Sequence, residues 1–405
     1  MKQQRQFAKV TVTKKAQRSL QGGHPWVYAG EVITAEPTPN GALCDLINEK
    51  GTYLGTGFYN DQSLIRVRVL SQNANDQFDE AFWRRRIRYS LDYRRIVMGT
   101  DFGCCRLIFG EADHFPGWTV DRFGSILVSQ IMSLGIEQIK DQLFALLWEE
   151  MEKLGEPIEG IYERNDIALR RKEGMSEGAG WAAGFEHPNS TLTQIVENGI
   201  RYEVDFGEGQ KTGFFLDQKY NRAAAARLAQ GRTVLDCCTH TASFALNAAQ
   251  AGAKRVIAAD ISASALASAK RNAQLNGLEA KMEFVQGDVF DLLADEKWKT
   301  QGIDYIILDP PAFTKSRKTI HNAYQGYCQI NTLAMKMLPR GALLATASCS
   351  HFMEDAMFEV MLQEAAQKAK VELRQIEVRH QAPDHPILMS VPETRYLKFY
   401  LFQIV

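Results

Sequence analysis

Four apolar runs between Arg232 and Asp309 each end in an aspartate, and no other feature constrains the fold of the chain as strongly. The aspartates are Asp236, Asp260, Asp288 and Asp309. Segments with helical spacing separate the runs, and strands that alternate with helices predict a parallel, doubly wound sheet. Ligands of such sheets bind just outside the carboxyl ends of the strands, where all four aspartates would lie. The stretch therefore predicts a nucleotide-like ligand.

The turn after the first run, residues 237–244, contains no glycine. A dinucleotide-binding turn needs the pattern G-x-G-x-x-G so that a pyrophosphate can approach the backbone, and NAD is therefore disfavoured. Asp260 is placed to accept hydrogen bonds from ribose hydroxyls, and Asp288 with Val289 is placed to hold an adenine edge. A sulfonium also favours a carboxylate-rich pocket. These features indicate S-adenosylmethionine, although a strand-end turn or a helix cap explains any single aspartate equally well.

The whole chain predicts an α/β protein with several domains. Its last two apolar runs, joined by a short link, predict an antiparallel pair that completes a seven-stranded, Rossmann-like class I methyltransferase sheet. Asn198-Gly199 predicts a tight hairpin turn. Residues 1–72 read as short β-runs, and GHPWVY, GTYLGTGFYN and IRVRVL within them resemble a PUA-type RNA-binding domain. We expect this PUA-like domain at 1–72, a basic helix with a central α+β domain at 73–190, a β-hairpin connector at 191–206 and the methyltransferase domain at 207–405.

The net charge of the 405 residues is only −1, so any contact with nucleic acid must come from a local basic patch. Residues 79–97 predict an amphipathic helix with Trp83, Ile87 and Leu91 facing inward. Arginine binds phosphates through two hydrogen bonds and stacks on bases. The candidate RNA-binding residues on the outer face are Arg84, Arg85, Arg88 and Arg95. A solvated linker helix explains this pattern nearly as well.

Seven cysteines occur in a chain whose first ten residues carry charges but no apolar core, which indicates a reducing cytoplasm. No apolar run approaches the roughly 20 residues that are needed to cross a bilayer. Cys104-Cys105 and Cys237-Cys238 are adjacent pairs rather than C-x-x-C motifs, and no histidine lies at ligand spacing from them. The sequence therefore predicts no metal site.

Cys349 follows the fifth apolar run, which places its thiol at the same carboxyl edge as Asp309. A free cysteine is often only a small buried side chain, but the neighbours Ser348, Ser350 and His351 are polar. Carbon 5 of a pyrimidine becomes nucleophilic once a thiolate has added to carbon 6. Asp309, on a loop stiffened by two prolines, is placed to hydrogen-bond the ring during that addition. Cys349 therefore favours pyrimidine C5 methylation over amino-group methylation, which needs no nucleophile.

Four motifs carry a resemblance to a known family: LDPPAF, TASCSHF, TGFFLDQ and the terminal DHP...E..YLKFY. They resemble the RlmI-type family of 23S ribosomal RNA cytosine-C5 methyltransferases, and the likeness covers nearly the whole chain, including a PUA-like start. The resemblance implies an S-adenosylmethionine-dependent enzyme that makes 5-methylcytidine in large-subunit ribosomal RNA, with Cys349 as the nucleophile and Asp309 as the motif-IV acid. The cofactor-binding residues that it implies are Gln218, Asp236, Cys238, Thr239, Ser243, Asp260, Ile261, Asp288, Val289 and Asp309.

The chain departs from the family pattern at two positions. Ala242 stands where the family commonly has glycine, and if that position needs a positive φ, alanine costs about 1 kcal/mol. Ala312 stands where other cytosine-C5 RNA methyltransferases have a second cysteine, so the base that takes the C5 proton is unassigned. Two other functions stay open: an amino- or N7-directed ribosomal RNA methyltransferase, and an RNA-binding assembly factor that has lost catalysis. A homodimer is also left open.

Overall fold

The computed structural model describes residues 7–209, 211–314 and 317–405. Residues 1–6, on which part of the expectation of no secretory leader rests, lie outside the described residues. Within the described ranges, no helix combines the length and apolarity that membrane crossing requires. The chain forms two compact units: unit 1 comprises residues 1–194, 204–216 and 383–394, and unit 2 comprises residues 195–203, 217–382 and 395–405. The domain boundaries expected from the sequence stay predictions.

The first part of unit 1 is a six-stranded sheet with the strand order β2-β6-β5-β4-β1-β3. Its strands are β1 (Ala8–Val12), β2 (Trp26–Tyr28), β3 (Val32–Ala35), β4 (Leu43–Ile47), β5 (Tyr53–Tyr59) and β6 (Ile65–Ser71). They confirm the short β-runs read from the sequence. Helix α1 (Lys14–Gln21) was not expected from the sequence. It begins at Thr13, whose hydroxyl accepts the N–H of Ala16, and it buries only Ala16 and Leu20.

Helix α2 (Glu80–Met98) confirms the predicted amphipathic helix. The carboxylate of Asp79 accepts the N–H of Phe82 at 2.9 Å and caps its first turn. Trp83, Ile87 and Leu91 are buried, as their four-residue spacing predicts.

The second sheet of unit 1 has five strands in the order β11-β10-β9-β8-β7. The strands are β7 (Cys104–Phe109), β8 (Trp118–Phe123), β9 (Ile126–Ile131), β10 (Gly160–Arg164) and β11 (Ala179–Trp181). The sequence of residues 136–154 predicts one helix, and this prediction is wrong, because α3 (Leu134–Gln138) and α4 (Lys140–Lys153) are separate. The chain turns at Ile139, whose N–H bonds to the carbonyl of Ile136 at 3.1 Å, one residue closer than α-helical spacing.

A two-stranded sheet consists of β12 (Leu192–Glu197) and β13 (Ile200–Asp205). Asn198 and Gly199 between the strands have φ values of +54° and +77°. Positive φ at both central residues is what a type I′ turn requires, so the hairpin predicted from Asn-Gly is confirmed.

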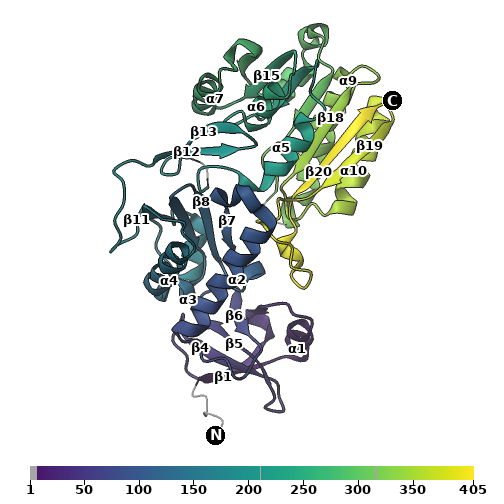
Figure 1. Ribbon diagram of the computed structural model, residues 1–405. Coiled ribbons are helices and arrows are strands. Elements are labelled where there is room, and N and C mark those ends of the chain that lie inside the picture. The colour runs from purple at the N-terminus through teal and green to yellow at the C-terminus, as the bar shows by residue number, and fades with distance from the viewer. Residues whose placement is uncertain (1–6, 210, 315–316) are drawn as a thin grey trace. The chain divides into compact units, whose positions relative to one another are not determined.

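Unit 2 contains a seven-stranded sheet with the order β16-β15-β14-β17-β18-β20-β19, which confirms the predicted fold class. The strands are β14 (Thr233–Cys237), β15 (Arg255–Asp260), β16 (Met282–Gln286), β17 (Tyr305–Leu308), β18 (Leu343–Ser348), β19 (Leu373–Arg379) and β20 (Lys398–Ile404). The first five strands pair in parallel, and β20 runs antiparallel to both β18 and β19. Figure 1 shows β18, β20 and β19 side by side.

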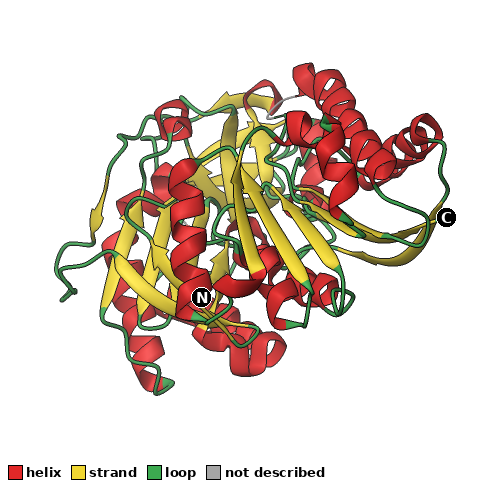
Figure 2. Cartoon of the chain, turned by 90° about the horizontal axis from the view of Figure 1, so that it is seen from above, coloured by secondary structure: helices red, strands yellow, loops and turns green. Residues whose placement is uncertain are grey.

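Helices cover both faces of this sheet, and strands and helices alternate along the chain (Figure 2). The helices are α5 (Lys219–Ala226), α6 (Ser243–Gln250), α7 (Ala263–Leu275), α8 (Val289–Ala294), α9 (Ile320–Met337) and α10 (Asp355–Ala369). Leu235 and Cys237 of β14 belong to a core that also contains apolar side chains of α8, α9 and α10. Side chains alternate along a strand, so Asp236 faces the other side of the sheet, where the N–H of Ala245 in α6 bonds to its carboxylate.

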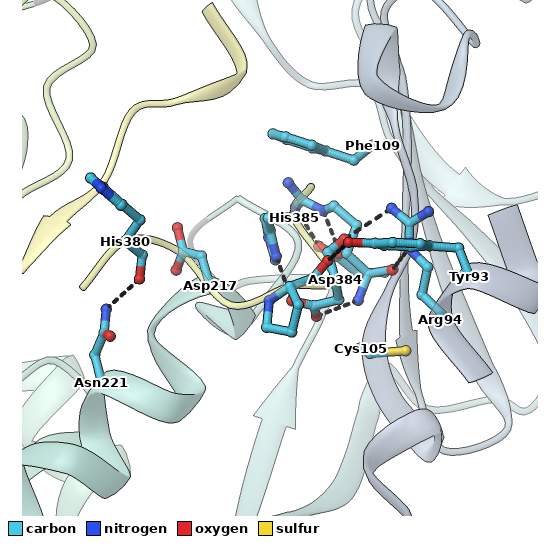
Figure 3. Close-up of polar contacts among 12 residues, drawn as sticks. Tyr93, Arg94, Cys105, Phe109, Asp217, Asn221, His380, Asp384 and His385 are labelled. Carbon is cyan, nitrogen blue, oxygen red and sulfur yellow. Dashed lines mark hydrogen bonds and ion pairs between the residues drawn. The ribbon is translucent and has the colours of Figure 1, made fainter. Parts of the chain in front are cut away.

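The link between β19 and β20 is longer than the short connection expected from the sequence, although the strands do pair antiparallel. Residues 383–394 of this link belong to unit 1. There the carboxylate of Asp384 accepts the N–H of Arg106 at 2.9 Å, and the Asp384 carbonyl accepts a hydrogen bond from Arg94 at 2.9 Å (Figure 3). A buried carboxylate needs such partners, and they hold the link away from a tight hairpin path.

Candidate active site

The predicted site residues of unit 2 meet at the carboxyl ends of parallel strands, which we call the carboxyl edge. Asp260 is the last residue of β15, Asp309 directly follows β17, and Cys349 directly follows β18. Strands β17 and β18 are neighbours, with Leu308 opposite Thr346. Neighbouring strands lie about 4.8 Å apart, so Asp309 and Cys349 leave the sheet from adjacent strands. Both side chains are partly exposed.

The loop between β14 and α6 has an alternating backbone. Cys238, His240 and Ala242 have φ values of +60°, +51° and +66°, although none of them is glycine. Alternating conformations of this kind turn backbone N–H groups inward. One of them, the N–H of His240, donates to the Asp260 carboxylate at 2.9 Å. The positive φ of Ala242 confirms the condition under which we expected a conformational cost at this position.

Asp236 anchors the same loop from inside the sheet. Its Oδ2 accepts the hydroxyl of Thr239 at 2.5 Å and the N–H of Ala245 at 3.0 Å. Its Oδ1 is buried and has no hydrogen-bond partner among the described residues. Burial is the largest cause that raises the pKa of Asp236 to about 7, and the charges of Asp309 and Asp260 act in the same direction. A buried acceptor without a donor fits a ligand that brings its own N–H group, as the ammonium of S-adenosylmethionine does.

The other strand-end carboxylates already hold backbone. The second oxygen of Asp260 accepts the N–H of Ser262 at 2.9 Å, and Asp288 caps α8 by accepting the N–H of Phe290 at 2.7 Å. The simpler explanation of Asp288 as a helix cap is thus present in the fold. Ile261 is 67% exposed, and this is unusual for an isoleucine beside buried strand residues. It offers a flat apolar surface next to Asp260, while Val289 is buried.

Gln218 and Asp309 are brought together from positions 91 residues apart in the sequence. The Gln218 side-chain amide donates to Asp309 Oδ1 at 3.0 Å, and its carbonyl accepts a hydrogen bond from Asn221 at 2.6 Å. Asn221 also donates to the carbonyl of His380 at 3.1 Å (Figure 3) and accepts a hydrogen bond from Arg379 at 3.0 Å. This chain of hydrogen bonds fixes the rotamer of the buried Gln218, and therefore the position of one Asp309 oxygen.

The turn that carries Cys349 is held from two sides. The hydroxyl of Ser350 lies 2.8 Å from that of Tyr327 in α9, and the ammonium of Lys398 in β20 donates to the Ser350 carbonyl at 2.7 Å. Lys398 also donates to the carbonyl of Tyr396 at 2.8 Å and is only 2% exposed. Burial lowers the pKa of Lys398 to about 8, although Asp355, Cys349 and Glu354 act in the opposite direction.

Sequence reasoning missed Tyr327 and Lys398. A lysine inside the apolar run of residues 396–402 was the available signal, because lysine is almost never fully buried without partners. Which partners it finds depends on the pairing of Ser348 with Lys398 across β18 and β20, and that register is not visible in the sequence.

The four arginines predicted to bind RNA lie on α2 in unit 1. Arg84 and Arg88 both bond to the carboxylate of Glu150 in α4, at 2.9 and 2.6 Å. Arg85 lies 3.3 Å from Asp76, and the side chain of Arg95 is exposed. Their contact with RNA stays a prediction. In the described part of the chain, no group of three or more histidine, cysteine, aspartate or glutamate side chains is arranged to hold a metal ion.

Two family models match the chain. The model of S-adenosylmethionine-dependent methyltransferases matches residues 148–402, and the model of PUA-like domains matches residues 10–72.

Among curated proteins, the chain is 36% identical to "Ribosomal RNA large subunit methyltransferase I" of Salmonella enteritidis over 99% of this chain and 98% of that protein. It is also 36% identical to the protein of the same name from Klebsiella pneumoniae, over 98% of this chain and 99% of that protein.

Among solved structures, a SAM-dependent methyltransferase from Streptococcus mutans has a TM-score of 0.80 with 22% identity, and it covers 98% of this chain and 99% of that chain. A methyltransferase solved in complex with SAH has a TM-score of 0.81 at the same identity and coverage. At this identity the two structures support the fold alone. The curated relatives and the matched model go further: the chain belongs to the S-adenosylmethionine-dependent methyltransferases, in the family of the ribosomal RNA large subunit methyltransferase I proteins.

Proposed function

We propose that the protein methylates carbon 5 of a cytidine in large-subunit ribosomal RNA, with Cys349 as the nucleophile. The names of the relatives support the class of substrate. The observation that carries the reaction type is the position of Cys349 and Asp309 directly after two adjacent parallel strands. A methyltransferase that acts on an amino group needs a polar or acidic loop at this place but no thiol.

S-adenosylmethionine, when bound, supplies the methyl group. We propose that the carboxyl edge holds it: the free oxygen of Asp236 would accept from the ammonium, and Asp260 would accept from the ribose hydroxyls. Ile261 would contact the adenine with its exposed side chain. The other residues proposed to surround the cofactor are Gln218, Cys238, Thr239, Ser243, Asp288, Val289 and Asp309. The absence of glycine from residues 237–244 fits a ligand without phosphate.

The chain itself would activate the base. The Cys349 thiolate would add to carbon 6 of the cytosine, which makes carbon 5 electron-rich. Once carbon 5 has taken the methyl group, a base would remove the C5 proton, and the thiolate would leave carbon 6. Asp309 would hydrogen-bond the ring N3 or the exocyclic amine and stabilise the charge that develops during addition. The Gln218 amide would keep the Asp309 carboxylate in one orientation. Lys398, through the Ser350 carbonyl, would fix the turn that presents the thiol.

The decisive experiment is the substitution Cys349→Ala. It should abolish methyl transfer to deproteinised 23S ribosomal RNA, while calorimetry still detects S-adenosylmethionine binding. The matched control is Cys328→Ala, which removes a thiol that is buried in α9 of the same unit. Wild-type turnover in Cys349→Ala would refute the assignment of Cys349 as the nucleophile.

Bisulfite sequencing of ribosomal RNA from a strain without the gene separates the alternatives. A C5 methyltransferase predicts that one protected cytosine disappears, whereas an amino- or N7-directed enzyme predicts no such loss. An assembly factor that has lost catalysis predicts that the purified chain does not bind S-adenosylmethionine. We also propose a cytoplasmic location, because ribosomal RNA is the proposed substrate, and the homodimer stays a prediction.

A further inference from the structure

Unit 1 contains a cavity of about 600 Å³, lined on one side by helix α2. The opposite walls are the turn at residues 112–114 and the segment 386–388 from the link between β19 and β20. Small-molecule sites commonly have this volume. We call it the α2 pocket. The predicted methyltransferase mechanism uses none of its residues.

The walls of the α2 pocket are held in place by buried polar contacts. Arg94 forms two hydrogen bonds to Asp113, at 2.5 and 2.7 Å, and a third to the carbonyl of Asp384. The hydroxyl of Tyr93 donates to the carbonyl of Pro383 at 3.0 Å (Figure 3). Residues 383 and 384, which directly precede segment 386–388, are thereby tied to α2. A pocket that is ordered before binding loses less entropy when a ligand enters.

One face of α2 presents a guanidinium and two phenol rings to the pocket. Arg85, Tyr89 and Tyr93 follow one another at four-residue spacing, so they lie in a row along the helix. Tyr89 is 65% exposed, which leaves a large aromatic face open to solvent. Unpaired bases stack on aromatic rings and on arginine planes, and successive bases need successive platforms. The row therefore has the form of a stacking surface for single-stranded nucleic acid.

The pocket also holds positive charge that its own carboxylates do not neutralise. The guanidinium of Arg86 donates to the carbonyls of His114 and Leu70 and lies over the ring of Phe82. Burial lowers the pKa of Arg86 to about 10, so it stays charged at neutral pH. Of the two carboxylates in the lining, Asp113 is bonded to Arg94 on both oxygens, and Asp76 pairs with Arg85 while its charge also raises the pKa of Arg86. One carboxylate thus faces two guanidinium groups, and one positive charge remains for a phosphate.

The other arginines of α2 are in a different position. Arg84 and Arg88 meet the carboxylate of Glu150, and Arg84 also bonds to Glu80 and Glu149. Acidic partners offset the charge of this face. Apart from the exposed Arg95, the charge of α2 that is available to an anion is therefore on the Arg85 and Arg86 side of the helix, next to the tyrosines.

We propose that the α2 pocket binds a single-stranded segment of the RNA substrate, with a base stacked on Tyr89 and a backbone phosphate near Arg85 and Arg86. The proposal rests on the proposed function, because that function makes RNA the substrate. The proposal adds an RNA contact to the one at the carboxyl edge of unit 2. The added contact lies in unit 1 and is built from α2 and the link between β19 and β20.

The test uses the full chain with a 16-nucleotide fluorescein-labelled single-stranded RNA and its duplex, and binding is followed by fluorescence anisotropy. Tyr89→Ala should weaken single-strand binding by about 5-fold to 150-fold, the range for loss of one base stack. Arg85→Gln should make the logarithmic salt dependence of binding shallower by about 0.7, the value for one phosphate of a single strand. Duplex binding should change less than single-strand binding in Tyr89→Ala.

Two controls match these variants. Ile96→Ala removes an apolar side chain that is 81% exposed on α2 and does not line the pocket. Arg171→Gln removes a surface guanidinium that is paired with Glu177, as Arg85 is paired with Asp76. Both should bind RNA like the wild type.

Wild-type affinity and salt dependence in both Tyr89→Ala and Arg85→Gln would overturn the proposal. If either variant kept wild-type RNA affinity but no longer bound a ribosomal protein, the proposal would be overturned, and the pocket would be a site for a protein partner. The proposed function is scored separately by methylation of full-length 23S ribosomal RNA. Normal kcat and KM in Tyr89→Ala would reject the pocket and keep the enzyme, whereas RNA binding without any methylation in the wild type would reject the enzyme and keep the pocket.

Discussion

The substitution Asp236→Asn tests the electrostatics of the carboxyl edge. Burial raises the pKa of the Asp236 carboxyl from its ordinary 3.8 to about 7 in the fold. The unfolded chain therefore loses this proton near pH 4, while the folded chain keeps it to about pH 7, and folding stability falls as the pH rises through that window. The full cost of ionising the folded carboxyl is about 4 kcal/mol. Roughly 1.5 kcal/mol of it is already present at pH 5, which leaves about 2.5 kcal/mol between pH 5 and pH 8.

An asparagine has the same shape but does not ionise. Its carbonyl can accept both the Thr239 hydroxyl and the Ala245 N–H, and its amide replaces an oxygen that already lacks a partner. The unmet hydrogen-bonding group is thus similar in both chains, and its cost nearly cancels. The stability of Asp236→Asn relative to the wild type should therefore grow by about 2.5 kcal/mol from pH 5 to pH 8.

Amide hydrogen exchange in β14 and β15 measures this difference without assuming that the two units unfold together. The ratio of protection factors, Asp236→Asn over wild type, should rise by about 70-fold between pH 5 and pH 8 without cofactor. Asp291→Asn is the control, because Asp291 is exposed on α8 and its ratio should stay flat. A ratio for Asp236→Asn that is the same at both pH values would refute the reasoning. If the carboxylate also holds the cofactor, the same variant should bind S-adenosylmethionine more weakly in calorimetry.

Three further outcomes can be measured by denaturation of the purified chain. Ala242→Gly relieves a positive φ, whereas Ala245→Gly weakens a helix interior. Ala242→Gly should therefore lower the free energy of unfolding by at least about 1 kcal/mol less than Ala245→Gly does. Because the pKa of Lys398 is lowered to about 8, the wild type should gain about 3 kcal/mol of stability between pH 8 and pH 10.5, and Lys398→Met should lose this gain. Glu197→Leu should cost about 3 to 5 kcal/mol because it removes the carboxylate that pairs with the buried Arg222, and adding Arg222→Met should recover most of that cost.

Much of the sheet of unit 2 could be predicted from the sequence because its pattern is locally complete. Apolar residues recur at helical spacing over more than three turns in residues 263–275 and 355–369, which predicts two helices, and the helices that form have these bounds. Helix α1 was missed because eight residues that bury two side chains give too weak a periodic signal. The path of residues 383–394 could not be predicted either, because it depends on partners such as Arg94 and Arg106 that lie more than 270 residues away.

In the site as well, features set by neighbouring residues could be predicted from the sequence, whereas contacts between distant segments could not. The sequence predicted that Asp309 and Cys349 lie at the same carboxyl edge, because parallel strands of a doubly wound sheet end there, and the structure adds that their strands are adjacent. The support of each residue depends on side chains from other elements. Gln218 reaches Asp309 from the segment before α5, and Lys398 reaches the Cys349 turn from β20. The first of these partners was named from a family resemblance, and the second had no such guide.

The carboxyl edge brings together four carboxylates that repel one another. The hydrogen bonds that stabilise them differ from one carboxylate to the next. Asp260 and Asp288 accept backbone N–H groups, and Asp309 accepts the Gln218 amide. Asp236 is the most buried of the four, and burial is the main reason why its pKa is raised; one of its oxygens has no partner among the described residues. A cationic ligand that donates to this oxygen would favour the ionised form and relieve the repulsion with Asp309 and Asp260. The same ligand would thereby recover part of the stability that the raised pKa of Asp236 removes at neutral pH, and cofactor binding and folding of unit 2 would then be coupled through one carboxylate.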